Sequence, residues 1–282
     1  MSEKDLSNDV VIHKKVDGIE YLQFRRLLEY KDRISHMYIL KNEGLEFCAG
    51  STEEEARQKV YSSYKVVCEK ENLDYTRIVR PLQTHSDVVK AIDTKICQDI
   101  PDIYLDEMMS TDGLVTNKKD LILASVNADC ILLLFYDPVK QVIANVHSGW
   151  KGTFEKIGQK TVEKMVKKYN CNPSDIICCM TPSIMSCCFE VHEDVKLLCE
   201  EAFAGMDILD KVLKFKKIED GKEKYSIDLN LINQLMLEKS GLKNENIISS
   251  EICSMCNSDI VHSRRGGSPK YKAGTALIGI RK

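Results

Sequence analysis

The chain has 282 residues, of which 43% are hydrophobic and 29% are charged, and its formal net charge is −3. This length and apolar content support a full hydrophobic core, and the lack of a basic excess excludes the field that non-specific nucleic-acid binding requires. No apolar run approaches the roughly 18 residues that span a bilayer, and the first residues lack the apolar segment of a signal peptide, so we expect a soluble, cytoplasmic protein without a membrane partner.

The twelve cysteines are spread along the whole chain. Without an export signal, this distribution favours reduced thiols that pack as small hydrophobic groups over a disulfide framework. No Pro/Gly/Ser-rich linker, low-complexity tract or fixed-period repeat divides the sequence. We therefore predict one domain over residues 1–282.

The N-terminal third contains both extended and helical patterns. Strands are predicted in "GIEYLQFRRLL" at 18–28 and in "ISHMYIL" at 34–40. Residues 51–73 begin with a Ser/Thr cap and carry acidic residues in the first turn, which predicts a helix. Two further strands, "RIVRPLQ" at 77–83 and "DVVKAI" at 87–92, flank the tripeptide "THS".

An apolar block at 121–147 contains three predicted strands, at 121–127, 131–136 and 142–147. The second and third are joined through Asp137-Pro138, which is a turn signal, so we predict an antiparallel hairpin. Neither strand alternates between apolar and polar residues. The hairpin is therefore expected to be buried on both faces.

The C-terminal half mixes helices with short strands. Helices are predicted at 153–169, 192–205 and 228–241, and strands at 176–180, 247–252 and 273–280. These elements do not follow a regular strand-helix-strand alternation. The order favours an α+β architecture with mixed sheets over a doubly wound fold.

Three residues at the ends of apolar segments are candidate metal ligands: His85, Cys130 and His147. A thiolate and two imidazoles suit zinc or copper better than carboxylates do, and three protein ligands leave a fourth position open for water or substrate. Taken singly, each histidine has an ordinary structural or surface interpretation, and an apolar cysteine is usually part of the core. The spacing alone does not establish a metal site.

Two glycine-containing loops are candidate anion sites. "SGWKGT" places backbone N–H groups and Lys151 at a predicted helix N-terminus, and "SRRGGSPKYKAG" offers Arg264 and Arg265. The alternatives are a tight turn for the first loop and a solvated loop for the second. Asp129, next to Cys130, is a candidate general base or hydrogen-bond partner, with a turn aspartate as the alternative.

Other cysteines lie in pairs. Cys253 and Cys256 form a single C-x-x-C, for which a structural zinc or a redox dithiol is an alternative to simple packing. Two adjacent pairs, 178–179 and 187–188, flank a loop. Adjacent residues of a strand face opposite ways, so we expect these pairs to pack rather than to chelate one ion.

Six segments resemble a known family in order and approximate spacing: "LQTHSDVV", "TDGLVTN", "NADCILLLFYDP", "VIANVHSGWKGT", "PSIMSCCFEV" and "CSMC…HSRRGG". They are similar to the YfiH/laccase-domain family, described both as multicopper polyphenol oxidoreductases and as zinc-dependent purine nucleoside phosphorylases. The resemblance covers about three quarters of the chain, from near residue 75 to the C-terminus. Its "ADC" and "H-x-GW-x-G" elements are specific.

The resemblance implies a compact α+β sandwich of layered mixed sheets flanked by helices. It implies a zinc site, with copper as the alternative, at His85, Cys130 and His147. It also implies phosphorolysis of adenosine, inosine, guanosine and methylthioadenosine, and deamination of adenosine. Purine nucleosides and phosphate are then the partners, and a homo-oligomer is compatible but not indicated. The resemblance also implies four candidate catalytic residues: Asp129, Lys151, Arg264 and Arg265.

The sequence departs from the family pattern at several positions. Lys151 replaces the usual arginine of G-W-R-G, Thr181 replaces the glycine of a Gly-Pro pair, and Gly266 replaces an acid after the paired arginines. The segment "LEFCAGS" at 45–51 stands where relatives often carry a polar "SLNLG"-like segment. These changes put part of the substrate contact in doubt.

Three other functions remain as alternatives to the phosphorylase. One is a copper-dependent phenol oxidase, although a single Cys/His₂ set argues against it. Another is a non-catalytic metal-binding protein. The third is a cysteine hydrolase that uses Cys130 as the nucleophile and His147 as the base.

Overall fold

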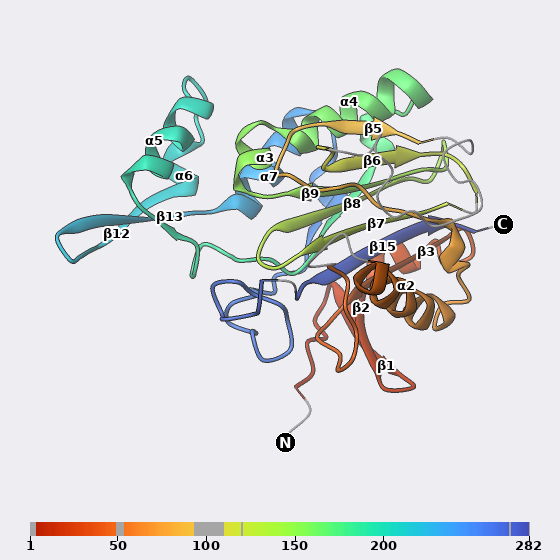
Figure 1. Ribbon diagram of the computed structural model, residues 1–282. Coiled ribbons are helices and arrows are strands. Elements are labelled where there is room, and N and C mark those ends of the chain that lie inside the picture. The colour runs from red at the N-terminus through yellow and green to blue at the C-terminus, as the bar shows by residue number, and fades with distance from the viewer. Residues whose placement is uncertain (1–3, 49–53, 93–109, 120, 271, 282) are drawn as a thin grey trace.

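The computed structural model describes residues 4–48, 54–92, 110–119, 121–270 and 272–281. These residues form two six-stranded sheets and one three-stranded sheet. The two large sheets lie face to face, with helices over the outer face of each (Figure 1). The predicted α+β class with layered mixed sheets is therefore confirmed.

The first sheet has the C-terminal strand at its centre. It contains β1 (Val11–Val16), β2 (Ile19–Phe24), β3 (Ile34–Ile39), β15 (Gly274–Ile280), β7 (Ile122–Asn127) and β4 (Ile78–Val79), in that order. Only β4 and β7 pair in parallel within this sheet. The strand predicted at 77–83 shortens to β4 because Pro81, which lacks a backbone N–H, follows it.

The second sheet carries the predicted hairpin. Its order is β14 (Ile247–Ser249), β10 (Ile177–Met180), β8 (Ile131–Asp137), β9 (Val142–Ser148), β6 (Gly113–Thr116) and β5 (Val89–Ala91). Strands β8 and β9 are antiparallel, with Leu132 opposite His147. Asp137 Oδ1 accepts the backbone N–H groups of Val139 and Lys140 at 2.8 and 2.9 Å, which closes the turn. The hairpin prediction is confirmed.

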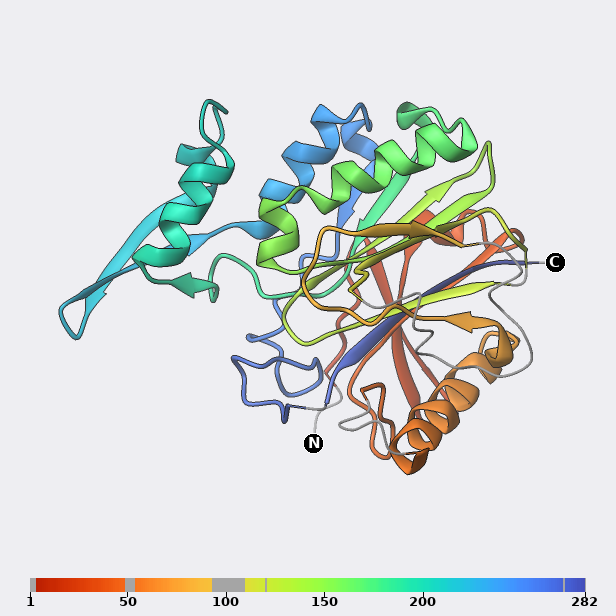
Figure 2. The ribbon, with the colours of Figure 1, turned by 45° about the horizontal axis from the view of Figure 1, so that its top comes forward.

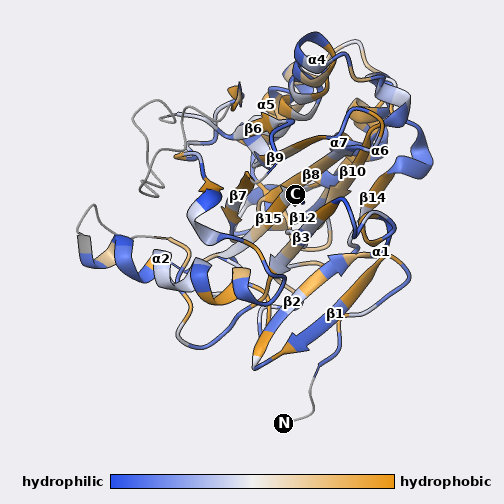
Figure 3. Cartoon of the chain, turned by 90° about the vertical axis from the view of Figure 1, so that its right-hand side faces the viewer, coloured by the Kyte–Doolittle hydropathy of each residue, from blue (hydrophilic) through white to orange (hydrophobic). Residues whose placement is uncertain are grey.

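Side chains of the hairpin alternate between two cores. Leu132, Leu134 and Tyr136 pack between the two large sheets, whereas Leu133 and Phe135 pack under the helices. Both faces are apolar because both are covered, which explains the absence of polar alternation in the sequence. Figure 3 accordingly shows predominantly apolar colouring on the central strands.

The helices are α1 (Arg25–Leu28), α2 (Glu54–Glu69), α3 (Trp150–Phe154), α4 (Ile157–Tyr169), α5 (Glu193–Ala202), α6 (Leu209–Val212) and α7 (Leu229–Lys239). Helix α2 covers the outer face of the first large sheet, and α3, α4 and α7 cover that of the second. Short 3₁₀ turns occur at Tyr75–Arg77, Pro173–Asp175 and Asn244–Asn246. The helix predicted at 153–169 is divided into α3 and α4 because Lys156 adopts a left-handed conformation, with φ of 61°.

Helices α5 and α6 belong to an arm that projects from the layered body (Figure 2). Its sheet has the order β11 (Glu190–Val191), β13 (Lys222–Ile227) and β12 (Leu213–Glu219). The sequence did not predict the β12–β13 hairpin, because β12 is largely exposed and rich in lysine. Within the described residues, no helix has the length and apolar character that crossing a membrane requires.

A buried amide joins the two large sheets near the end of β9. Asn145 Nδ2 donates to Leu123 O at 3.0 Å and to Ala276 O at 2.9 Å, both in the first sheet. Its Oδ1 accepts the hydroxyl of Ser125. Asn145 lies two residues before His147 and therefore on the same face of β9, so this bridge fixes the strand that carries the histidine.

We expect Asn145→Ala to lower the free energy of unfolding by about 3 kcal/mol, because it leaves buried carbonyl groups without a donor. Urea denaturation measures the change as a shift of the midpoint at constant slope. Asn244→Ala is the control, since Asn244 is exposed, and it should change stability by less than about 0.5 kcal/mol. Equal effects of the two substitutions would contradict a contribution of the Asn145 hydrogen bonds to stability.

Candidate metal site and adjoining cavity

The structure brings His85, Cys130 and His147 together at one end of the β8–β9 hairpin. One ligand atom from each lies within 4.8 Å of the others, and Cys130 Sγ is 3.8 Å from His85 Nε2. Cys130 directly precedes β8, and His147 is the penultimate residue of β9. Antiparallel pairing therefore places both residues at the same end of the hairpin. His85 comes from the loop between β4 and β5. His85 is exposed, whereas His147 is buried.

Asp112, directly before β6, holds this arrangement together. Its carboxylate accepts the backbone N–H groups of Thr84, His85 and Ser86 at 3.2, 3.1 and 2.7 Å, and the Ser86 hydroxyl at 2.6 Å. The same carboxylate lies 2.7 Å from His147 Nδ1. These bonds hold His85 in a left-handed conformation, with φ of 63°, that costs energy in a residue other than glycine.

The contact with Asp112 also sets the tautomer of His147. A proton on Nδ1 donates to the carboxylate and leaves the lone pair of Nε2 free for a metal. Burial disfavours the charged carboxylate, but the hydrogen bonds from His147 and Ser86 outweigh burial and lower the pKa of Asp112 to about 2. Asp112 is therefore ionised at neutral pH and always available as an acceptor.

Cys130 and His147 form a coupled acid-base pair. Burial opposes ionisation of the thiol, but the charge of His147 and hydrogen bonds from His147 and His85 prevail and lower the pKa of Cys130 to about 6. Burial also opposes the charge on His147, yet the thiolate and Asp112 raise the pKa of the imidazole to about 9. The site thus favours a thiolate, which is the form that binds metals.

Two geometric tests support a fit between these residues and zinc. Ideal tetrahedral bonds to one sulfur and one nitrogen place those atoms about 3.6 Å apart, close to the 3.8 Å between Cys130 and His85. In addition, a Cβ on Gly149 would lie 2.7 Å from His85 Cδ2 and 3.2 Å from Cys130 Sγ. Glycine at this position therefore leaves room for the three ligand side chains to converge.

The Asp129 carboxylate is engaged by a different loop. Its Oδ1 accepts the Ser254 hydroxyl at 2.6 Å, and its Oδ2 accepts the backbone N–H of Arg265 at 2.9 Å. Asp129 has a φ of 89°, so the chain bends directly before Cys130. This geometry makes Asp129 an anchor that holds the 254–265 loop beside Cys130.

The candidate cationic residues lie at two places. Lys151 is exposed, with Nζ 5.6 Å from the ring centre of Trp150. Arg264 donates to the carbonyl groups of Ser268 and Lys270. Arg265 donates to Glu190 O at 3.0 Å. Both guanidinium groups thus support loop backbone, and each retains further N–H groups for a ligand.

Two departures from the family pattern have structural reasons. A Cβ on Gly266 would lie only 2.4 Å from Ser258 Cβ, so the close packing of this loop excludes a larger residue. Thr181 extends the pairing with β8, because its N–H donates to Leu132 O at 3.0 Å and its hydroxyl accepts the Leu132 N–H at 3.1 Å.

A cavity of about 720 Å³ opens beside His85. One wall comes from α3 and the other from α5 of the arm, and Trp150 and Phe154 supply aromatic surface, with ring centres 5.4 Å apart. Its lining includes Lys151 but neither Arg264 nor Arg265. The cavity is large enough for a nucleoside-sized ligand and includes one of the three candidate metal ligands.

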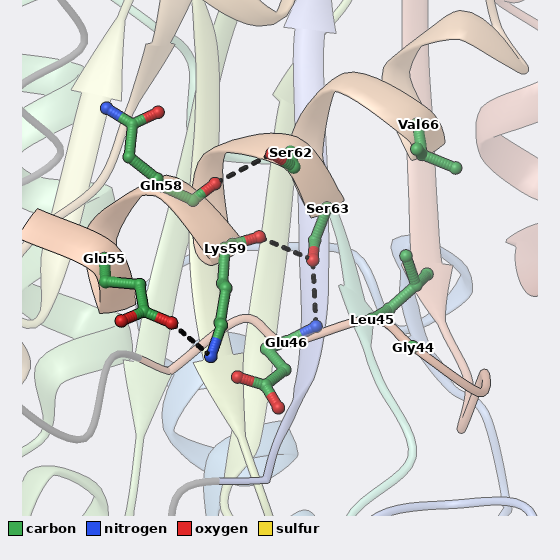
Figure 4. A pocket seen from close by; sticks show the side chains of 9 residues that line it. All are labelled: Gly44, Leu45, Glu46, Glu55, Gln58, Lys59, Ser62, Ser63 and Val66. Atoms are coloured by element: carbon green, nitrogen blue, oxygen red, sulfur yellow. Dashed lines mark hydrogen bonds and ion pairs between the residues drawn. The ribbon is translucent and has the colours of Figure 1, made fainter.

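A second pocket, of about 440 Å³, lies between α2 and the loop at residues 44–46 (Figure 4). Its lining is mainly charged and hydroxyl side chains, and Lys59 pairs there with Glu55 at 3.2 Å. None of the candidate ligand or catalytic residues lines it. We therefore assign no chemistry to this pocket.

Sequence reasoning missed Asp112 as a functional residue. The segment "TDGLVTN" indicates only the family pattern and does not by itself point to a role for its aspartate. An aspartate before a buried strand is common, and its role becomes visible only when the fold places the 84–86 loop and His147 around it. The residues Cys187, Cys188, Cys253 and Cys256 were also not expected to converge, although they do.

In the metal-free protein, alkylation of Cys130 should reach half of its maximal rate near pH 6, because the thiolate reacts and the pKa of this thiol is about 6. An ordinary thiol, with a pKa of about 8.5, would require a higher pH. Peptide mass spectrometry after timed iodoacetamide treatment measures the profile. His147→Ala should move it to higher pH, and identical profiles would contradict the proposed coupling.

Asp112→Asn should weaken zinc binding about 10-fold to 100-fold, because it removes the acceptor that orients His147 and the loop carrying His85. Protection of Cys130 from alkylation, titrated against buffered free zinc, reports on this site alone. Asp17→Asn is the matched control, since the Asp17 side chain is exposed and pairs with Lys70 on the surface. An unchanged zinc midpoint in Asp112→Asn would refute the role of the carboxylate.

Comparisons with known proteins agree with the fold and locate the chain in a family. Residues 43–281 match the family model described as multi-copper polyphenol oxidoreductase laccase. The chain is 32% identical over 211 residues to purine nucleoside phosphorylase YlmD of Bacillus subtilis strain 168, covering 75% of this chain and 73% of that protein. It is 31% identical over 211 residues to adenosine deaminase RL5 from an unknown prokaryotic organism, covering 74% and 76%.

A solved structure has the same fold. The crystal structure of the hypothetical protein YfiH from Bacillus licheniformis superimposes with a TM-score of 0.80 over 95% of this chain and 99% of that chain, at 24% identity. The resemblance inferred from the sequence motifs is therefore confirmed. The chain belongs to the laccase-like family whose model is described as multi-copper polyphenol oxidoreductase laccase.

Proposed function

We propose that this chain is a zinc-dependent purine nucleoside phosphorylase. The observation that carries the proposal is the convergence of His85, Cys130 and His147 beside a cavity that His85 lines. One wall of this cavity carries Trp150 and Phe154, and its lining also includes lysine and carboxylate side chains. The name of the relative YlmD supports the reaction class. Adenosine, inosine, guanosine and methylthioadenosine are the proposed substrates, each with inorganic phosphate.

His85, Cys130 and His147 are the proposed metal ligands, and a bound zinc ion supplies Lewis-acid polarisation of a substrate oxygen. The mixed nitrogen and sulfur set suits zinc, and three ligands leave one position for substrate. Among the described residues, no other histidine-containing group of potential ligands accompanies this set. This argues against the copper oxidase alternative, which needs several copper sites.

The cavity residues have proposed roles in substrate binding. Trp150 and Phe154 offer aromatic surface for a purine base, and Lys151 offers positive charge to phosphate. In the reaction, a phosphate oxygen forms a bond to ribose C1′ while the bond from C1′ to the purine nitrogen breaks. The electron pair leaves with the base, which then takes up a proton. The products are the free base and ribose 1-phosphate, or the 5-methylthio form of that sugar phosphate when methylthioadenosine is the substrate.

Asp129 and the two arginines have proposed roles outside the lining of this cavity. The backbone contact between Arg265 and Asp129 keeps the arginine loop beside the ligand cysteine. The free N–H groups of Arg264 and Arg265 are suited to phosphate or ribose oxygens. Asp129 is proposed as a positioning residue for this loop.

Adenosine deamination is a second proposed activity, supported by the relative that is named adenosine deaminase RL5. In this reaction water adds at the purine carbon that carries the amino group, and ammonia leaves to give inosine. The same cavity can serve both reactions if the purine binds in two orientations. The products separate them, since phosphorolysis of adenosine gives adenine and deamination gives inosine.

Zinc-loaded protein incubated with adenosine and phosphate should release adenine and ribose 1-phosphate, measured by chromatography. His147→Ala should reduce the rate at least 100-fold, because it removes one metal ligand and the partner of Cys130. His192→Ala is the control, since His192 is exposed and makes no capping hydrogen bond. Its rate should match that of the wild type.

Omission of phosphate distinguishes the two proposed activities. Adenine release should stop without phosphate, whereas inosine release should continue. If the zinc-loaded wild type released neither product, both activities would be refuted. If copper-loaded protein oxidised phenols while the zinc form was inert toward nucleosides, the oxidase alternative would replace the proposal.

A further inference from the structure

A second group of potential metal ligands lies outside the site described above. It consists of Cys187, Cys188, Cys253 and Cys256, here called the four-cysteine cluster. All four sulfur atoms lie within 4.8 Å of one another. The measured separations are 3.6 Å for 187–188, 3.8 Å for 187–256 and 3.4 Å for 188–256. Residues from two loops about 65 positions apart in sequence therefore meet at one point.

The local backbone explains why adjacent cysteines converge. Residues 186–188 form a turn rather than a strand, so the expectation that Cys187 and Cys188 face opposite ways was wrong. Residues 254–257 form a second turn, and Cys253 and Cys256 are three positions apart across it. A turn brings side chains at such spacing to one side of the chain, as in the C-x-x-C half of many zinc sites.

The sulfur separations match a tetrahedral metal better than disulfide bonds. Four sulfurs bound to zinc at about 2.3 Å lie about 3.8 Å apart along each edge of the tetrahedron. A disulfide requires about 2.05 Å. The three measured separations, 3.4 to 3.8 Å, lie close to the tetrahedral edge and far from the disulfide length.

We propose that the four-cysteine cluster is a second metal site that binds one zinc ion through four thiolates. Four protein ligands fill a tetrahedral shell and leave no position for substrate, so this site is structural. It differs in kind from the set of His85, Cys130 and His147, which has three ligands. The proposal does not depend on the phosphorylase activity.

Backbone contacts hold the two loops of the cluster together. The two loops pair directly, because Ser183 N donates to Ile252 O at 3.2 Å and Ser254 N donates to Ser183 O at 2.9 Å. Backbone N–H groups of Met185 and Cys256 also hydrogen-bond to the Cys253 sulfur. N–H donors of this kind orient thiolate ligands and offset their charge.

Lys216 lies beside the four-cysteine cluster, where it also pairs with Glu190 at 2.9 Å. Zinc with four thiolates carries a net charge of about −2, which is stabilised by nearby cations. Lys216 Nζ donates to Cys187 O at 2.8 Å. Cys187 and Cys256 are exposed, so a metal ion can enter from solvent, while Cys253 is buried.

A metal in the cluster would stiffen the frame beside the first site. Both loops contact Asp129, which directly precedes Cys130: Ile184 N donates to Asp129 O at 2.8 Å and Ser254 Oγ donates to its carboxylate at 2.6 Å. Zinc therefore cross-links two loops that hold the residue next to a ligand of the first site. Its removal should loosen this frame without removing any ligand of the first site.

Metal stoichiometry tests the proposal. Protein purified with zinc under reducing conditions, then dialysed and analysed by mass spectrometry for elements, should contain two zinc ions per chain. The double variant His85→Ala/His147→Ala and the variant Cys256→Ser should each contain one. Cys48→Ser is the matched control, because Cys48 is a partly exposed cysteine outside both groups, and it should retain two.

X-ray absorption at the zinc edge identifies the ligands in the double histidine variant, where only the cluster remains. Four sulfur neighbours at about 2.3 Å are expected. Nitrogen or oxygen neighbours, or no bound zinc in this variant, would overturn the proposal even if Cys256→Ser failed to fold. Peptide mapping that found disulfides among the four cysteines of the reduced, zinc-supplied protein would also overturn it.

Zinc content and activity, measured on the same samples, distinguish a failure of this proposal from a failure of the proposed function. If the wild type binds two zinc ions but cleaves no nucleoside, the phosphorylase proposal fails and the cluster stands. If the wild type is active with one zinc ion and Cys256→Ser keeps that ion, the cluster proposal fails alone.

Discussion

The candidate site depends on one buried carboxylate. Asp112 accepts three backbone N–H groups and a hydroxyl from residues 84–86, and it also contacts the His147 imidazole. A buried charge is costly unless it is fully hydrogen-bonded, so this carboxylate is stable only when the loop and the histidine surround it together. The same requirement brings the rings of His85 and His147 together, with centroids 4.8 Å apart.

The β8–β9 hairpin places Cys130 at the same end of the sheet as His147. Because Leu132 pairs with His147, the residue before β8 lies beside the end of β9, and that residue is Cys130. The bridge from Asn145 to the first sheet fixes β9 against sliding. Packing between the sheets thus determines how Cys130 and His147 lie relative to each other.

Much of this fold could be predicted from sequence where signals are local. The β8–β9 hairpin follows from two apolar runs and Asp137, and α7 follows from the Asp228 cap and its apolar spacing. The break at Lys156 could not be predicted, because no local sequence signal marks a lysine in the left-handed conformation. The β12–β13 hairpin lacks the apolar alternation on which strand prediction depends.

Residue type and family resemblance suggested the candidate ligand residues. The residues that hold them in place could not be predicted in this way. Asp112 and the partners of Asp129 come from distant segments, and no spacing rule relates them. The prediction about Cys187 and Cys188 was wrong for a related reason, since it assumed strand geometry for residues that form a turn. Prediction from one sequence is therefore strongest for elements and weakest for contacts between loops.

The two groups of potential metal ligands differ in their surroundings. The three-ligand set adjoins the cavity through His85, so it can meet a substrate. The four-cysteine cluster lies among loops that contact Asp129, the residue next to Cys130. Because a binding site gains precision from rigid neighbours, a metal that cross-linked these loops would make the backbone next to Cys130 more rigid.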